Sequence, residues 1–123
     1  MTKGELAKLN FESGMNCAQA VVLAFKDEMA LSEQTLKKLI IGFGGGFARQ
    51  RLVCGAVSGM TMVLGYLKSD GEDKLASYAL IKSACEDVKA SIGSIICGEL
   101  LSENKVPCGE ICKIVADITA KYL

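Results

Sequence analysis

Apolar residues recur three and four positions apart along most of the chain, which is the spacing of amphipathic helices, and alternating strand patterns are almost absent. The predicted helices are Lys3–Ser13, a helix that begins at Asn16, a helix from Ser32 to the glycines at 42–46, Leu52–Leu67, Asp73–Ala90, Ile95–Leu101 and Pro107–Tyr122. No internal repeat or linker interrupts them. We therefore predict an all-α fold, a single-domain orthogonal bundle of six or seven helices over residues 1–123.

Local signals mark where several of these helices begin. Asn16 is a typical N-cap residue, and Gln19 three positions later completes a capping box. Ser32 and Thr35 mark a second start, and Pro107 suits the first position of the last helix.

The spacing of apolar residues also predicts which side chains face the core. The predicted inward residues are Leu6, Leu9, Phe11, Cys17, Val21, Ala24, Phe25, Leu36, Leu39, Ile40, Leu75, Tyr78, Ile81, Cys85, Val88, Cys108, Ile111, Val115, Ile118 and Tyr122.

The longest uncharged segment is Leu52–Leu67, which Arg49, Arg51 and Lys68 bound closely. It is shorter than the roughly 18–20 residues that cross a bilayer, so we expect a helix buried in a protein core and no membrane association. The first residues lack the apolar run of a signal peptide. A reducing cytoplasm is therefore the expected location, where cysteines seldom form permanent disulfides.

Composition narrows the chemistry further. The 14 basic and 14 acidic residues cancel, so no net charge favours nucleic acid or anionic lipid. The chain has no histidine, which excludes Ser–His–Asp and Cys–His catalysis, histidine metal ligands and the CxxCH attachment of c-type haem. Six cysteines remain as the most unusual feature of the composition.

The cysteines are Cys17, Cys54, Cys85, Cys97, Cys108 and Cys112, and no two are spaced CxxC. A shared site must therefore be assembled from different helices, although Cys108 and Cys112 lie one turn apart and could bind one metal. Cys17 and Cys108 fall in predicted first turns, where backbone N–H groups and the helix dipole stabilise a thiolate. Cys85 lies within an apolar stripe, and we expect it to be an inert core residue.

A glycine-rich segment, residues 42–46, precedes Arg49 and Arg51. It matches GxGxxG poorly and follows no strand, which argues against a dinucleotide-binding motif. It is either a flexible turn or a backbone cradle for a thiolate or an anionic cofactor, in which case the candidate binding residues are Gly44, Gly45, Gly46, Arg49 and Arg51. Gly55 and Gly59 are four apart, which suits close packing of another helix near Cys54.

Several short motifs together resemble the C_GCAxxG_C_C family of redox-active proteins. They are Asn16-Cys17-Ala-Gln-Ala-Val, the glycine-rich segment with Arg49 or Arg51, Cys54-Gly-Ala-Val-Ser-Gly59 and the separate cysteines downstream. The resemblance extends from about Phe11 to the end of the chain. It implies that Cys17, Cys54 and Cys97 are the first three family cysteines, that Cys112 or Cys108 is the fourth, and that these small, mostly bacterial proteins have a redox role. The central motif reads Cys-Gly-Ala, where the family name has Gly-Cys-Ala.

Three hypotheses follow for the function. The cysteines Cys17, Cys54, Cys97, Cys108 and Cys112 bind an iron–sulfur cluster or another thiophilic metal such as zinc, which needs thiolates alone. Alternatively, redox thiols, with Cys17 and Cys54 as the first candidates, cycle between dithiol and disulfide. In the third, the chain is a helical interaction module whose cysteines fill its core. A redox partner, not identified by the sequence, is expected in the first two cases, and a homodimer is predicted from the long uncharged helix.

The first two hypotheses share a geometric requirement. Because the chain offers no CxxC pair, sulfurs from different helices must approach one another. We predict that Cys17, Cys54 and Cys97, with Cys108 or Cys112, face one pocket beside the glycines at 42–46, and that Cys85 lies elsewhere.

Overall fold

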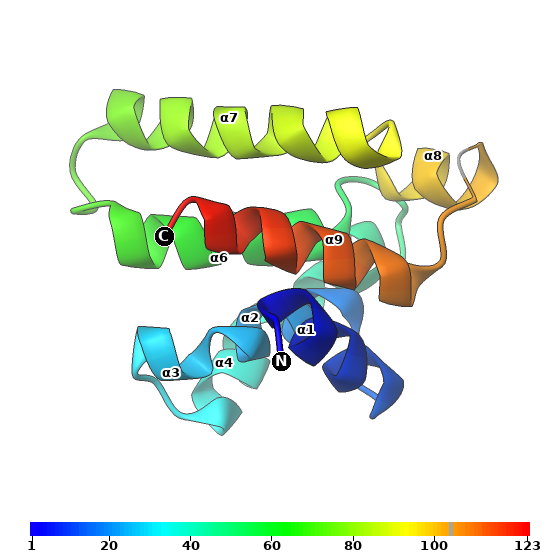
Figure 1. Cartoon of the computed structure of the whole chain (residues 1–123), viewed down its shortest axis with the longest axis horizontal. Helices are drawn as coiled ribbons and strands as arrows, with labels where there is room; N and C mark the ends of the chain where they lie inside the picture. Colours follow the sequence, from blue (N-terminus) through cyan, green and yellow to red (C-terminus); the bar gives the residue numbers. More distant parts are fainter. Residues whose placement is uncertain (104) are drawn as a thin grey trace.

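The computed structural model describes residues 1–103 and 105–123, and this part of the chain is mostly helical (Figure 1). The elements are α1 (Lys3–Glu12), α2 (Cys17–Ala24), α3 (Lys26–Met29), α4 (Glu33–Ile40), the 3-10 helix η1 (Ile41–Phe43), α5 (Gly44–Phe47), α6 (Gly55–Lys68), α7 (Lys74–Ile92), α8 (Cys97–Ser102) and α9 (Cys108–Lys121). The all-α prediction is confirmed, because the described residues contain no strand beyond an isolated bridge between Val53 and Ile96.

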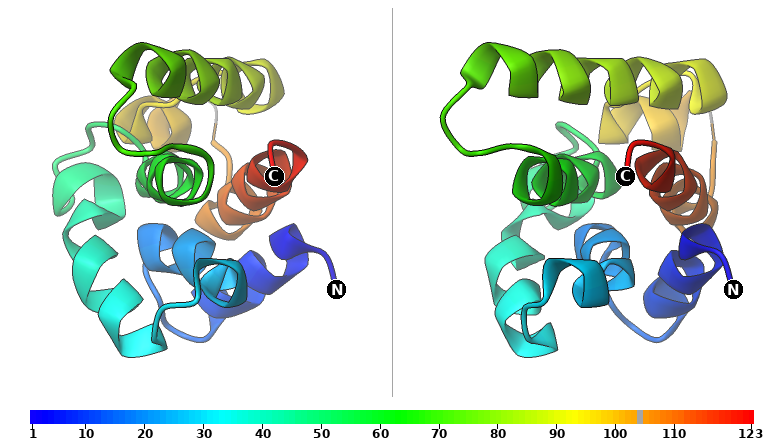
Figure 2. Two further views of the ribbon diagram at one scale, coloured as in Figure 1. Left: turned by 90° about the vertical axis from the view of Figure 1, so that its left-hand side faces the viewer. Right: turned by 60° about the vertical axis from the view of Figure 1, so that its left-hand side comes forward.

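Two helices form the centre of the bundle. Figure 2 shows α6 in the middle, with α7 on one side of it and α2 on the other, while α1 and α9 pack together at the edge. α2 is central because Ala18–Ala24 are buried on every side of the helix. Its one buried polar residue, Gln19, has its polar groups satisfied, since Nε2 donates to the Lys37 carbonyl and Oε1 accepts from the Asn16 N–H.

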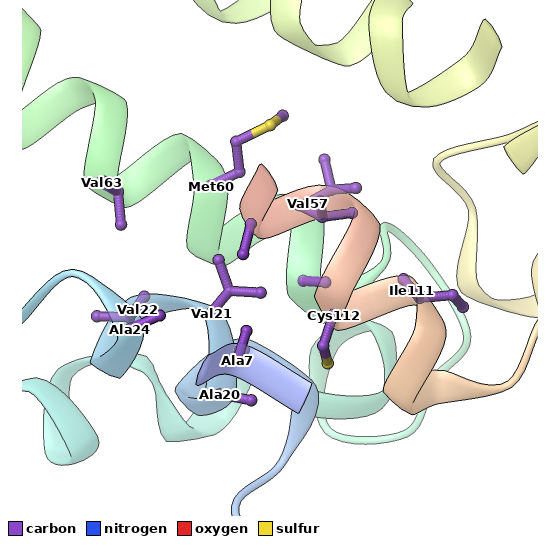
Figure 3. Packing of buried hydrophobic residues seen from close by; sticks show 14 of the residues in the cluster. Ala7, Ala20, Val21, Val22, Ala24, Val57, Met60, Val63, Ile111 and Cys112 are labelled. Atoms are coloured by element: carbon purple, nitrogen blue, oxygen red, sulfur yellow. The ribbon is translucent and has the colours of Figure 1, made fainter. Parts of the chain in front are cut away.

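The hydrophobic core lies between α1, α2, α6 and α9. Figure 3 shows Ala7, Val21, Val57 and Cys112 meeting there, each from a different one of these helices. These side chains are small or β-branched, so helix axes can approach closely and the volume between them is still filled. The helices that carry most of the cysteines are therefore held against one another by the core itself.

The prediction for the longest uncharged segment was partly wrong. The helix α6 begins at Gly55 rather than at Leu52, because residues 52–54 are extended and run beside residues 95–97. Leu52 is about half exposed as a result. No helix in the described part of the chain is long and apolar enough to cross a membrane.

Some residues of three predicted inward stripes are exposed instead. Leu75 and Tyr78 are 80% and 63% exposed, and the buried residues of α7, which are Ala84, Val88 and Ile92, all lie in its second half. Leu9 and Leu39 are likewise about half exposed. The remaining inward residues of the predicted stripes are buried or partly buried against the core.

Candidate cysteine site

Four helices of the bundle begin at a cysteine. Cys17, Cys97 and Cys108 are the first residues of α2, α8 and α9, and Cys54 is the N-cap residue of α6. The predicted first-turn positions of Cys17 and Cys108 are confirmed, with Pro107 one position earlier than predicted, as the N-cap. The positions of Cys54 and Cys97 at helix starts were not predicted. Ile96 gives no capping signal, and the start of α6 depends on its pairing with a distant segment.

The start of α2 is well defined by its own sequence and by the glycine-rich segment. Asn16 forms the predicted capping box with Gln19, so the cap accepts the Gln19 backbone N–H at 2.9 Å. The same Asn16 amide donates to the Ile41 carbonyl at 3.0 Å and packs directly on Gly44, where a Cβ would overlap it. Cys17 is thereby held beside the turn that follows α4.

Cys17 contacts both α6 and α9. A Cβ on Gly55 would be 2.5 Å from Cys17 Sγ, so the sulfur packs on the bare backbone at the first turn of α6, next to Cys54. From the other side, Cys112 Sγ donates a weak hydrogen bond to the Cys17 carbonyl at 3.8 Å. The prediction that Gly55 and Gly59 permit close packing is confirmed, since a Cβ on Gly59 would lie only 3.0 Å from the Ala18 carbonyl of α2.

Burial is the main influence on the pKa values of two buried thiols, Cys54 and Cys112. Burial is the main reason that the pKa of Cys54 is raised to about 12; backbone hydrogen bonds from Val57 and Ala56 oppose the rise, and the neighbouring thiols of Cys17 and Cys97 add to it. Burial also raises the pKa of Cys112 strongly, with Cys17, Cys54 and Cys108 adding to it in that order. Both groups are therefore neutral thiols at pH 7.

Cys108 lies at the outer side of this group. Burial raises the pKa of its thiol, and the thiols of Cys17 and Cys97 raise it further, whereas Arg51 lowers it. Desolvation is thus the main influence on the pKa of Cys108, and it opposes the stabilisation of a thiolate expected at the first turn of a helix. These mutual effects place Cys108 within electrostatic reach of Cys17, Cys97 and Arg51.

Cys97 is held against Arg51 by paired backbone segments. Its N–H donates to the Leu52 carbonyl at 2.6 Å, and the Gly98 N–H donates to the Arg51 carbonyl at 3.2 Å. Arg51 Nη1 then donates to Cys97 Sγ at 3.6 Å. A Cβ on Gly46 would lie 2.9 Å from the Cys97 Cβ, so this glycine is also needed for the close approach.

The glycine-rich segment continues into a left-handed turn. Gly45, Gly46, Phe47, Ala48 and Arg49 all have positive φ, between 53° and 72°. For the three residues that are not glycine, this conformation costs about 1–2 kcal/mol each, and backbone hydrogen bonds across residues 42–52 hold the turn closed. Among the candidate binding residues, Gly44 and Gly46 contact the helices that carry Cys17 and Cys97.

Arg49, a candidate binding residue, and Cys85, which was expected to lie elsewhere, are both outside this group. Arg49 is exposed and packs over Gly45. Cys85 is half-buried on α7, and the charged groups that act on it are its helix neighbours Glu86 and Lys89 rather than other cysteines. Burial is the main cause that raises the pKa of Cys85.

The predicted metal ligands are five cysteines, whose thiolates are chemically suited to bind an iron–sulfur cluster or zinc. Their positions, however, do not form a metal-binding group. Within residues 1–103 and 105–123, no three cysteine or carboxylate side chains are arranged to hold one metal ion. Sulfurs sharing a metal lie within roughly 4 Å of one another, given bonds of about 2.3 Å. What the arrangement does offer is neighbouring thiols from separate helices, which suits exchange between thiol and disulfide.

Comparisons with known proteins agree with the sequence motifs. No curated protein and no solved structure shows significant similarity to the chain. A family model described as "Putative redox-active protein (C_GCAxxG_C_C)" matches residues 15–122. This range includes all six cysteines and the glycine-rich segment, so the resemblance noted in the sequence is confirmed. The chain belongs to the C_GCAxxG_C_C family.

Proposed function

We propose that the chain is a thiol–disulfide redox protein in which Cys17 and Cys54 interconvert between dithiol and disulfide. The observation that carries this proposal is the contact of Cys17 Sγ with Gly55, the residue that follows Cys54. Cys17 is also the first of the neighbouring thiols that raise the pKa of Cys54. A disulfide requires Cα atoms within about 7 Å, which a sulfur packed on the adjacent backbone favours.

The two thiols have different roles in the reaction. Cys17 is the more exposed of the two, so its thiolate attacks one sulfur of a substrate disulfide, and the other substrate sulfur leaves and takes up the proton that Cys17 released. Cys54 then attacks the Cys17 sulfur and expels the second substrate thiol, to which its proton passes. The protein loses two electrons and two protons, and the substrate disulfide becomes two thiols.

The environment of Cys54 fits the second step. As a neutral, buried thiol it does not compete for the first attack. Once the mixed disulfide has formed on Cys17, the backbone N–H groups of Ala56 and Val57 stabilise the thiolate that Cys54 must form to attack it. The reduced form persists in a reducing compartment such as the cytoplasm, where a partner thiol would regenerate it.

Mild oxidation of the reduced protein tests the proposal. We expect a disulfide-linked peptide pair containing Cys17 and Cys54 in peptide maps after treatment with glutathione disulfide, and the same pair in the control C85S. The variants C17S and C54S should lack it. Detection of Cys17 in a stable disulfide with Cys112 instead would show that the pairing is wrong.

The metal hypothesis calls for a separate measurement. Anaerobic purification followed by metal analysis and a visible spectrum tests whether the thiolates hold a cluster, because iron–sulfur clusters absorb visible light and disulfides do not. Stoichiometric iron or zinc that is lost in C17S and retained in C85S would favour a metal centre over the dithiol that we propose.

A further inference from the structure

An open groove lies against α6, on the side of the bundle that α4, η1 and α5 form (Figure 2). This α6 groove has a volume of about 270 Å³ and is lined by Ile40, Phe43, Ser58, Thr61 and Met62. The Thr61 hydroxyl donates to the Val57 carbonyl of its own helix at 2.9 Å, so the lining offers mainly apolar surface. The apolar surface continues outward, because the Phe43 ring lies 5.0 Å from the ring of the exposed Phe47.

One end of the α6 groove adjoins the sulfur of Cys17. That sulfur packs on Gly55, which is three residues before Ser58 and seven before Met62, so helical spacing puts all three on one face of α6. On the facing wall, the Phe43 carbonyl oxygen is 2.8 Å from the position of a Gly55 Cβ. A side chain bound in the groove would therefore lie next to the proposed attacking thiol.

The segment that forms the groove carries positive charge alone. No Asp or Glu occurs from residue 34 to residue 69, although the whole chain has 14 acidic residues, and the same range contains five Lys or Arg. Every residue that lines the groove belongs to this range. A chain with no net charge thus presents a positive field around this groove, which favours a negatively charged partner.

Arg49 lies on the turn that packs against the first turn of α6. The Gly44 Cα is 3.2 Å from the position of a Gly55 Cβ, and the Gly44 carbonyl accepts the Arg49 N–H at 3.2 Å. The Arg49 side chain packs over Gly45 and is exposed, and no ion pair joins it to a carboxylate of residues 1–103 or 105–123. Its guanidinium can therefore pair with a carboxylate of a bound chain.

We propose that the α6 groove binds a disulfide-containing segment of an acidic partner protein, with an apolar side chain in the groove and a carboxylate at Arg49. This inference rests on the function proposed above, because it takes Cys17 as the attacking thiol. A protein segment fits better than a free low-molecular-weight disulfide, since the groove is smaller than the roughly 300–1,000 Å³ of small-molecule sites and suits one side chain. Glutathione disulfide has no apolar side chain to place there.

The partner disulfide is the electron acceptor in this reaction. Cys17 forms a mixed disulfide with one partner sulfur, and the other partner sulfur leaves as a thiol with the proton that Cys17 released. Cys54 then attacks Cys17 and expels the remaining partner sulfur, to which its proton passes. The partner gains the two electrons and two protons that the chain loses.

Peptide disulfides of defined sequence test this recognition. The probes are acetyl-Glu-Cys-Leu-Glu-amide, the same peptide with Lys for both Glu, and the same peptide with Ser for Leu, each joined through its cysteine to 2-thiopyridine. Rates of thiopyridone release by the reduced wild-type chain are divided by the rates with dithiothreitol, which corrects for the intrinsic reactivity of each peptide. We expect the acidic leucine peptide to react at least about fivefold faster than the lysine peptide and about tenfold faster than the serine peptide.

Variants of the chain locate the effect, once circular dichroism has shown that they are folded. S58L fills the groove and should lower the rate of the leucine peptide to that of the serine peptide, whereas S91L makes the same exchange on an exposed position of α7 and should not. R49Q should reduce the preference for the acidic peptide about two- to fivefold. K82Q removes the same charge from α7 and should leave the preference unchanged.

Binding without chemistry is measured by NMR, using the acidic peptide with Ser in place of Cys, for which we expect amide shifts at the residues that line the groove. Equal corrected rates for the three peptides would overturn the groove proposal and leave the proposed function intact. Faster reaction with glutathione disulfide than with any peptide would also overturn it, as would a dimer in sedimentation that excludes the peptide. Shifts at the groove without any Cys17–Cys54 disulfide would refute the proposed function, and with it the redox role of the groove.

Discussion

Replacing Gly55 with alanine tests the packing at the centre of the cysteine site. The added Cβ would lie 2.5 Å from Cys17 Sγ, 2.8 Å from the Phe43 carbonyl oxygen and 3.2 Å from the Gly44 Cα. Two of these three contacts are with backbone atoms, which cannot rotate away as the end of a side chain can. The start of α6 must therefore move away from α2 and from the glycine-rich segment.

The same helix provides graded controls. Gly65 has no heavy atom within 4 Å of its missing Cβ, whereas Gly59 would meet the Ala18 carbonyl at 3.0 Å and Val21 at 3.3 Å. Overpacking in a core costs about 1–3 kcal/mol, and alanine in an open helix position gains about 0.5–1 kcal/mol over glycine. We expect G65A to be more stable than wild type, G59A to be less stable, and G55A to be least stable, about 1–3 kcal/mol below wild type.

Urea unfolding under reducing conditions, followed by circular dichroism at 222 nm, measures these differences directly. In thermal unfolding, each 1 kcal/mol corresponds to a change in Tm of roughly 3–5 °C for a chain of this size. G55A should also change the reactivity of Cys17, because its sulfur must shift, whereas G65A should not. If G55A were as stable as G65A, Cys17 would not lie against Gly55, and the argument for the Cys17–Cys54 pair would fail.

Three other predictions concern the thiols and the surface. Cys17, at the start of α2, should react with iodoacetamide faster than Cys85 in the reduced protein, and equal labelling in peptide maps would refute the argument from helix position. The pKa of Cys54 is raised from 9.0 to about 12 in the folded state, so the unfolded chain loses this proton at a lower pH than the folded chain does. The free energy of unfolding of the wild type should therefore fall relative to that of C54S as the pH rises from 9 to 12. Parallel curves of unfolding free energy against pH for the two proteins would contradict the shift. The exposed Leu75 and Tyr78 add to the expectation of a homodimer, which sedimentation at tens of micromolar tests, with a monomer counting against it.

The helices themselves could be read from the sequence because their signals are local. The capping box of Asn16 and Gln19 involves residues three apart, and the periodic spacing of apolar residues indicates α9 without reference to any other segment. The first-turn positions of Cys17 and Cys108 follow from these local rules. The motifs around Cys17 and Cys54 likewise indicate the family, because they are short runs of neighbouring residues.

The environment of each cysteine depended instead on contacts between distant segments. Arg51 and Cys97 are 46 positions apart, and they meet because Val53 pairs with Ile96, a contact that also delays the start of α6 until Gly55. No local rule predicts such a pairing, since its stability depends on the packing that surrounds both segments.

Gly55 and Gly65 show, within a single helix, the same difference between what the local sequence indicates and what contacts with distant segments decide. Both are glycines in the apolar sequence of α6, yet Gly55 faces a cysteine sulfur and a carbonyl oxygen while Gly65 faces open space. The sequence by itself determined the residue type, the helix and the family of the chain. Only the tertiary structure decided which neighbours each residue meets, because van der Waals contact and desolvation depend on atoms that the chain brings together from far apart.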